Sequence, residues 1–241
     1  MEFFDTHSHY NDEKFNEDRE QIIKDTYKSG VTKFVCAGYN IESSKKAIEM
    51  SQKYEFIYSI CGISPNDIPR SEEELWKDIA QITKIIEDNK TNKLVAIGEI
   101  GLDYYWNKKN KELQKEAFIK QINLANELNL PIVIHSRDAS IDIIDIIRKY
   151  PVKKAGIFHC CQFNQEMIRQ ALELGYYISF AGPVTFKNSK NAPEIIKMIP
   201  LNRILIETDS PYLTPEPNRG KRNDSRNVKY IAQKIADVRE M

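Results

Sequence analysis

The order of the predicted secondary-structure elements is the feature that most restricts how this chain folds. Short apolar runs rich in β-branched residues alternate with amphipathic segments eight times along 241 residues. This alternation is typical of buried parallel strands joined by helical crossovers. The predicted strands are residues 3–6, 33–37, 56–61, 93–98, 131–135, 155–159, 176–181 and 203–207. The predicted helices are residues 17–29, 41–53, 72–88, 110–129, 138–149, 164–174, 192–198 and 225–240.

Eight strand–helix units predict closure into a (β/α)8 barrel, the α/β fold known as the TIM barrel. Such barrels commonly span about 200–250 residues as one domain, so we expect residues 1–241 to form a single domain. An open, doubly wound parallel sheet is the alternative fold for the same order of elements. In a barrel, functional side chains are expected at the C-terminal ends of the strands.

All four histidines fall at predicted strand ends, and a glutamate and an aspartate follow the runs KLVAIG and RILIET. Two divalent cations held roughly 3.5–4 Å apart need several nitrogen and oxygen ligands and a bridging anion. The sequence therefore predicts a two-metal hydrolytic site, with unrelated core or surface histidines as the alternative. The predicted ligands are His7, His9, Glu99, His135, His159 and Asp209.

The spacing of these residues also suggests their roles. Alternate residues of a strand share a face, so His7 and His9 can chelate one ion while Thr6 and Ser8 point away. Glu99 is expected to bridge the ions, because the lysine of the same strand lies at its opposite end. Asp209 can bind a metal and accept a proton from the attacking water. The alternatives are a loop-capping role for the glutamate and a helix or turn cap for the aspartate.

The charge balance restricts how a polyanion is bound. Thirty-five basic residues offset thirty-five acidic ones, so any polyanion must be held by a local patch. Basic residues cluster after the predicted strands 5, 7 and 8, where barrels often bind phosphate. The predicted substrate contacts there are Arg137, Lys187, Arg219, Lys221 and Arg222. After strand 4, the aromatic run 104–106 either stacks on a base or packs against the barrel.

Other features bear on location. No apolar stretch approaches 18 residues, and residues 1–10 lack the basic and apolar regions of a signal peptide. We therefore expect a cytoplasmic protein without membrane contact. The four cysteines have no CxxC spacing, so a structural zinc site built on sulfur is not expected.

Several motifs together resemble the TatD-type metal-dependent deoxyribonucleases. They are HSH (7–9), AIGEIGLDYYW (96–106), PIVIHSRDA (131–139), HC (159–160), SFAGPVTFKN (179–188) and ETDSPYLTPEPNRGKRN (207–223). The resemblance implies an amidohydrolase-like TIM barrel, two divalent metal ions, and hydrolysis of DNA phosphodiesters, commonly as a 3′-to-5′ exonuclease. Position by position, it places the family's ligands on the six residues already predicted.

The chain departs from the family pattern at three places. GISPN replaces GIHPH after strand 3, so Ser64 stands where a substrate-facing histidine is expected. HCCQFN replaces HCFSG, which puts Gln162 and Phe163 in place of a small Ser-Gly pair. The end, ADVREM, comes earlier than is usual in the family. None of these changes affects a predicted ligand.

The expected function is metal-dependent hydrolysis of DNA, acting on 3′ ends or single strands. Magnesium, manganese, zinc and nickel all suit imidazole and carboxylate ligands. One alternative is a small-molecule amidohydrolase or phosphoesterase with the same metal pair. Another, motivated by Ser64, is a catalytically weak relative that binds nucleic acid.

Overall fold

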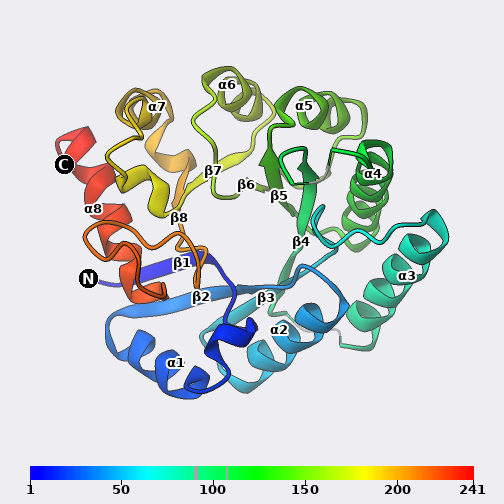
Figure 1. The fold of residues 1–241 in the computed structure, drawn as a ribbon, viewed down its shortest axis with the longest axis horizontal. Coiled ribbons are helices and arrows are strands. Elements are labelled where there is room, and N and C mark those ends of the chain that lie inside the picture. The colour runs from blue at the N-terminus through cyan, green and yellow to red at the C-terminus, as the bar shows by residue number, and fades with distance from the viewer. Residues whose placement is uncertain (90–91, 107) are drawn as a thin grey trace.

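The structure, a computed structural model, describes residues 1–89, 92–106 and 108–241. In these residues eight parallel strands are hydrogen-bonded in chain order and helices form a ring outside them (Figure 1). The predicted (β/α)8 barrel is thus confirmed, and the open, doubly wound sheet is excluded. The strands are β1 (Phe3–Ser8), β2 (Val31–Ala37), β3 (Ile57–Cys61), β4 (Leu94–Asp103), β5 (Ile132–Arg137), β6 (Ile157–Phe158), β7 (Tyr177–Phe180) and β8 (Ile204–Ile206).

The helices follow the strands as predicted, to within a few residues at each end. Gly30, with φ of 97°, follows the first helix, and Asn129, with φ of 53°, ends the fourth. Short 3-10 turns precede or connect several elements, including η4 (Ser225–Asn227) before the last helix. The α-helices are α1 (Arg19–Lys28), α2 (Ile41–Lys53), α3 (Glu72–Asp88), α4 (Lys111–Leu128), α5 (Ser140–Lys149), α6 (Gln165–Glu173), α7 (Ala192–Met198) and α8 (Val228–Arg239).

The barrel closes between β1 and the segment that follows β8. Ser8 and Ser210 form a parallel bridge. The backbone N–H of Asp209 donates to His7 O at 3.0 Å, and that of His9 donates to Ser210 O at 2.7 Å. This closure brings the first and last predicted ligand segments side by side.

The apolar side chains pack in two layers. The larger layer lies between the strands and the surrounding helices, and Ile97, Ile132 and Phe118 are fully buried in it. A smaller cluster that includes Val35, Ile60 and Val133 lies inside the barrel. Burial on both faces explains why the strands are almost continuously apolar in sequence. None of the helices in the described ranges is long and apolar enough to span a membrane.

Several predicted strand boundaries were wrong, most of all the end of β4. β4 continues to Asp103, well past residue 98, because it keeps pairing with β5 as far as Arg137. Gly98 and Gly101 both lie within this strand. β6 and β8 are shorter than predicted, with two and three residues, respectively.

Bulges change the direction of side chains in β1 and β4. Between Asp5 and Ser8, β1 advances three residues while β2 advances two, so β1 has one extra residue. Thr6 and His7 consequently both face the barrel interior, and the Thr6 hydroxyl lies 3.3 Å from Ser179 Oγ. The prediction that Thr6 points away from the histidines was wrong, because strict alternation was assumed. Ser8 does turn aside and donates to a backbone oxygen of β2.

Gly101 lies where β4 approaches β5 closely. Its φ is 141°, and a Cβ there would lie 2.1 Å from His135 O. We predict that Gly101→Ala lowers the free energy of unfolding by about 2–3 kcal/mol, because the strands cannot separate without losing pairing. The measurement is the urea denaturation midpoint. Gly220→Ala is the matched control, since Gly220 has φ of 85° but nothing within 4 Å of the added Cβ. Equal losses in the two variants would show that close approach is not the constraint.

Candidate metal centre

The barrel brings all six predicted ligands to its C-terminal mouth. His7 lies in β1 and His9 directly after it. Glu99 occupies the bulge of β4, where β4 advances three residues from Ile97 to Ile100 while β5 advances two. Because of this bulge, the glutamate side chain reaches the centre from within a strand rather than from a loop. The other ligands come from β5 and from the ends of β6 and β8: His135, His159 and Asp209.

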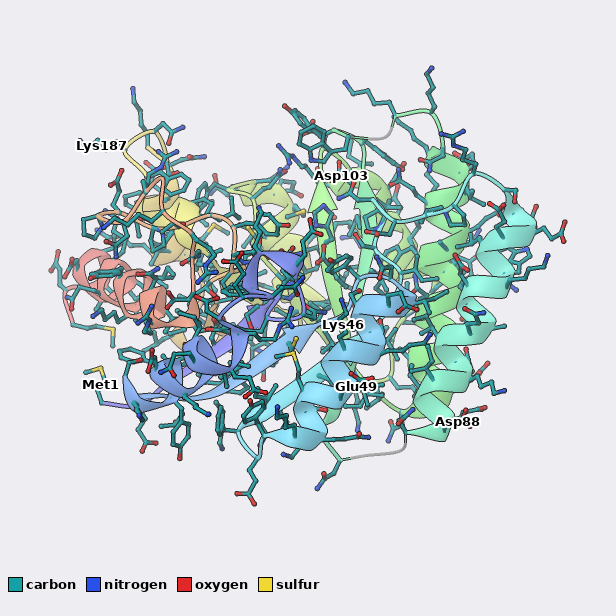
Figure 2. All side chains as sticks on the ribbon, turned by 60° about the horizontal axis from the view of Figure 1, so that its bottom comes forward. Met1, Lys46, Glu49, Asp88, Asp103 and Lys187 are labelled. Carbon is teal, nitrogen blue, oxygen red and sulfur yellow. The ribbon has the colours of Figure 1, made fainter. Side chains whose placement is uncertain are left out.

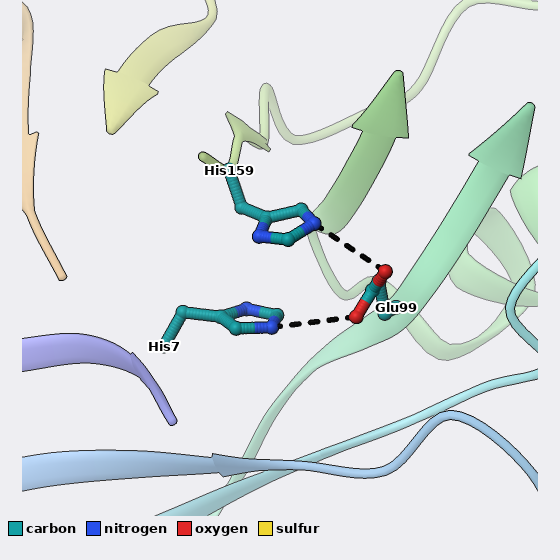
Figure 3. A group of neighbouring side chains, drawn as sticks. All are labelled: His7, Glu99 and His159. Carbon is teal, nitrogen blue, oxygen red and sulfur yellow. Dashed lines mark ion pairs between the residues drawn. The ribbon is translucent and has the colours of Figure 1, made fainter. Parts of the chain in front are cut away.

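The Glu99 carboxylate lies between two pairs of imidazoles. Its Oε2 is 3.4 Å from His7 Nε2 and 3.8 Å from His9 Nε2. Its Oε1 is 2.9 Å from His135 Nδ1 and 3.4 Å from His159 Nε2. Figure 3 shows two of these contacts, with the His7 and His159 rings approaching the carboxylate from one side. Each carboxylate oxygen therefore faces its own pair of nitrogen ligands.

Asp209 completes the group around the first two histidines. Its Oδ1 lies 3.2 Å from His9 Nε2 and 3.8 Å from His7 Nε2. The residue has a left-handed φ of 56°, which costs about 1–3 kcal/mol in a non-glycine residue. The backbone hydrogen bond across the barrel closure holds it there. Among the described residues, two groups could each hold a metal ion, because their candidate ligand atoms all lie within 4.8 Å of one another. These groups are His7, Glu99 and His159, and His7, His9 and Asp209.

Burial and mutual charge set the protonation of the cluster. Burial alone raises the pKa of Glu99, but the surrounding histidines outweigh it and hold the pKa well below its usual value. Burial and the neighbouring His159 lower the pKa of His7. The glutamate is therefore ionised and His7 neutral, the forms in which they bind metals. Burial also lowers the pKa of His159, but its two glutamate neighbours raise it well above its usual value, so cation binding would release a proton.

The unpaired nitrogens of His7 show that the cluster fits a cation. Among the described residues, neither His7 Nδ1 nor Nε2 has a partner in hydrogen-bond geometry, although the side chain is fully buried and Nε2 lies 3.4 Å from Glu99 Oε2. A buried polar atom without a partner is costly and calls for an explanation. A divalent cation held by Nε2 and the neighbouring carboxylates would satisfy this nitrogen. Imidazole and carboxylate donors together suit zinc, manganese and related ions.

Three further contacts orient the histidine rings. His9 Nδ1 lies 3.2 Å from Ala37 O, and His135 Nε2 lies 3.0 Å from Asp103 Oδ2. His159 Nδ1 lies 3.4 Å from Glu207 Oε1. Such outer contacts fix the ring orientation and tautomer of metal-binding histidines.

Two of these orienting residues, Asp103 and Glu207, were not predicted from the sequence. Asp103 and Glu207 are fully buried, as acids rarely are without a partner. Their spacing was the available signal: Asp103 stands four residues after Glu99, and Glu207 stands two before Asp209. Residues at even spacing share a face in a regular strand, but β8 ends at Ile206, so this signal applies to Glu207 and Asp209 only within the predicted strand. The signal was missed for Asp103 because β4 was expected to end at residue 98.

Ser64 lies near the centre but is not open to solvent. Only 3% of it is exposed, and its Oγ accepts the Asn66 N–H at 3.4 Å. The Asn66 amide in turn donates to Asp103 Oδ2 at 3.3 Å. In this arrangement Ser64 shapes the loop after β3. Its predicted direct contact with substrate stays a prediction.

The predicted basic contacts differ in their surroundings. Lys187 and Lys221 are exposed, and Figure 2 shows Lys187 on the same upper side of the molecule as Asp103. The Arg219 guanidinium lies 3.9 Å from the centroid of the Phe186 ring. Arg222 instead forms a two-point ion pair with Asp18, so its charge is already offset. Arg222 is therefore the weakest of these candidates for binding a phosphate.

The aromatic run after strand 4 divides into core and surface residues. Tyr104 is buried and donates its hydroxyl to Asp142 Oδ2 at 2.6 Å. Tyr105 and Trp106 are exposed. The packing alternative thus holds for the first aromatic only.

Phe163 is one of the departures from the family pattern. Its ring centroid lies 6.2 Å from that of Phe180.

A parallel barrel with histidines and carboxylates gathered at its C-terminal mouth is the arrangement of metal-dependent TIM-barrel hydrolases. Residues 4–241 match the family described as TatD related DNase. The chain belongs to this family of metal-dependent hydrolases.

Two curated relatives agree with this assignment, and a solved structure agrees with the fold. The Bacillus subtilis protein described as "Uncharacterized metal-dependent hydrolase YabD" is 44% identical over 239 residues, which cover 99% of this chain and 91% of that protein. The Escherichia coli K12 protein described as "Uncharacterized metal-dependent hydrolase YcfH" is 40% identical over 180 residues, covering 73% and 64%, respectively. The crystal structure of YjjV, a TatD homolog from Escherichia coli K12, matches with a TM-score of 0.91 at 23% identity, covering 98% of this chain and 90% of that chain.

We predict that Asp103→Asn weakens metal binding by about tenfold or more, because the neutral amide no longer stabilises the His135 ring in its binding orientation. Competition with a chromophoric chelator measures the affinity for zinc or manganese. Asp142→Asn is the control, since that aspartate bonds Tyr104 outside the cluster. If both variants bind metal like the unaltered protein, Asp103 has no orienting role.

Proposed function

We propose that this protein hydrolyses DNA phosphodiester bonds with two divalent cations, as a 3′-to-5′ exodeoxyribonuclease. The observation that carries the proposal is the position of Glu99. Its two oxygens face two separate pairs of imidazoles, as a carboxylate that bridges two cations requires.

In this proposal, His7, His9 and Asp209 would hold one cation and His135 and His159 the other, with Glu99 shared between them. Magnesium, manganese, zinc or nickel would supply positive charge there, which lowers the pKa of a water molecule and offsets the charge of the phosphate. The chain's own residues fix the ligand positions and keep the cluster shielded from bulk solvent.

Asp209 is the residue proposed to accept the proton of the attacking water. The histidines around it outweigh the effect of burial and lower the pKa of its carboxyl, so it is ionised and able to accept. Its Oδ1 already lies at the centre of the cluster, within 3.2 Å of His9 Nε2. A general base must lie within hydrogen-bond reach of the proton it removes.

DNA is the proposed substrate for two reasons. The chain belongs to a family named for deoxyribonuclease activity. The loops after β5, β7 and β8 also supply basic side chains that suit phosphates: Arg137, Lys187, Arg219 and Lys221. The local patch compensates for the zero formal net charge of the chain.

A small-molecule amidohydrolase or phosphoesterase is the second candidate. It is favoured by the burial of Ser64, which replaces an expected substrate-facing histidine, and by the ion pair that occupies Arg222. Both reduce the contacts available to a nucleic acid. The catalytically weak binding protein has less support, because all six predicted ligand residues come together.

Hydrolysis of 3′-labelled oligodeoxynucleotides after metal removal and reconstitution tests the proposal. We predict that chelation abolishes cleavage and that one of the four metals restores it, with products shortened from the 3′ end. A metal-loaded protein that hydrolyses small esters or amides but no DNA would favour the second candidate.

We predict that Glu99→Gln lowers the turnover number for DNA by about a hundredfold or more, because an amide cannot supply the bridging negative charge. Far-ultraviolet circular dichroism checks that the barrel remains folded. Elemental analysis reports the bound metal. Turnover close to that of the unaltered protein with full metal content would refute the bridging role.

We predict that Asp209→Asn lowers kcat for DNA by about a hundredfold and changes KM much less, since the lost carboxylate acts on the water and one cation. Steady-state kinetics at saturating metal separate the two parameters. A change confined to KM would assign Asp209 to substrate binding instead.

The basic loops separate the two candidate functions. We predict that Lys187→Gln, Arg219→Gln and Lys221→Gln combined reduce kcat/KM for DNA about a hundredfold and flatten its salt dependence, because fewer counterions are released. The matched control neutralises three exposed lysines on outer helices, Lys46, Lys197 and Lys229. If the two triple variants behave alike, the loop residues do not bind the phosphates.

A further inference from the structure

An exposed aromatic pair follows β4 at the barrel mouth. Tyr105 is 49% exposed and Trp106 is 68% exposed, although the tyrosine directly before them is buried. The two rings meet edge to face, with centroids 4.8 Å apart. A tryptophan this exposed leaves much of its apolar surface in water, which favours contact with a ligand that covers it.

Arg137 lies against this pair from the neighbouring strand. Its guanidinium carbon is 3.9 Å from the centroid of the Tyr105 ring and 5.4 Å from that of the Trp106 ring. Within the described ranges, no ion pair joins Arg137 to a carboxylate. The arginine therefore keeps its charge for an anion while it supports the rings by a cation–π contact.

The segment after the aromatics adds further positive charge. Lys108 and Lys109 are both exposed, and within the described part of the chain neither has an ion-pair partner. Aromatic faces beside unpaired basic side chains are the chemistry of sites for single-stranded nucleic acid, where bases stack and the backbone is held electrostatically.

A single carboxylate joins this platform to the metal centre. Asp103 Oδ1 accepts the backbone N–H groups of Tyr105 at 2.9 Å and Trp106 at 3.0 Å. Its other oxygen, Oδ2, lies 3.0 Å from His135 Nε2. The backbone of the pair is therefore fixed next to His135, a predicted metal ligand.

We infer that Tyr105, Trp106 and Arg137 form a stacking subsite for the unpaired base of the nucleotide next to the scissile phosphate. The inference rests on the proposed function and deepens it. Because a base within a duplex is already stacked and paired, the subsite makes single-stranded or frayed ends the preferred substrate.

Hydrolysis of two oligodeoxynucleotides tests this subsite. One has a normal 3′-terminal nucleotide and the other an abasic one. The unaltered protein is expected to have about a tenfold higher KM for the abasic end, since stacking is lost. Trp106→Ala should show the same increase with the normal end and no additional increase with the abasic end. Trp106→Phe, which keeps an aromatic face, should restore most of the difference.

A binding measurement without turnover supplies an independent readout. The chain has two tryptophans, and Trp76 lies on α3 in the outer ring of helices. In a Trp76→Phe variant with metals chelated, the fluorescence of Trp106 should be quenched saturably by single-stranded oligodeoxynucleotide. An oligomer of abasic nucleotides of equal length and charge should quench much less.

The outcomes separate the subsite from the proposed function. The subsite is refuted, while the nuclease activity stands, if the unaltered protein has the same KM for normal and abasic ends and Trp106→Ala changes neither value. Equal quenching by both oligomers refutes it as well, since it would reflect charge alone. If the metal-loaded protein hydrolyses no DNA, the proposed function fails, and the subsite with it.

Discussion

A buried carboxylate surrounded by imidazoles is the interaction on which the rest of this site depends. Only 6% of Glu99 is exposed, and four histidines lie within 3.8 Å of its two oxygens. A buried charge is tolerated only when it is paired, so the histidines and the glutamate require one another. The bulge in β4, the closure of β1 onto the segment after β8, and the close approach of β4 to β5 all serve to bring them together.

The sequence predicted what depends on periodicity and position. Eight alternations gave the barrel, and the strand ends gave six predicted ligands that the structure brings together, because a parallel barrel gathers the C-terminal ends of its strands at one mouth. Periodicity and position do not predict β-bulges. One extra residue in β1 turns both Thr6 and His7 inward, and only the pairing register reveals it. The length of β4 depended likewise on pairing with β5, so Asp103 was missed.

The sequence also did not predict which side chains are buried or paired in the folded protein. The basic residues after β8 form one run in sequence, yet Arg222 is paired with Asp18 from a distant segment whereas Lys221 is exposed. Tyr104 and Trp106 are two positions apart, and one is buried while the other is exposed. Such differences arise from tertiary contacts that local pattern does not contain. Asp103 shows the consequence, since one carboxylate contacts the predicted ligand His135 and also fixes the backbone of the exposed aromatic pair.

The most direct test of this account is to locate the cations themselves. Crystals grown with manganese or zinc would give anomalous difference peaks at the positions of bound metal. The account predicts two peaks about 3.5–4 Å apart, one on each side of the Glu99 carboxylate, with His7 and His9 at one and His135 and His159 at the other. A single peak, or two peaks that do not share Glu99, would contradict it.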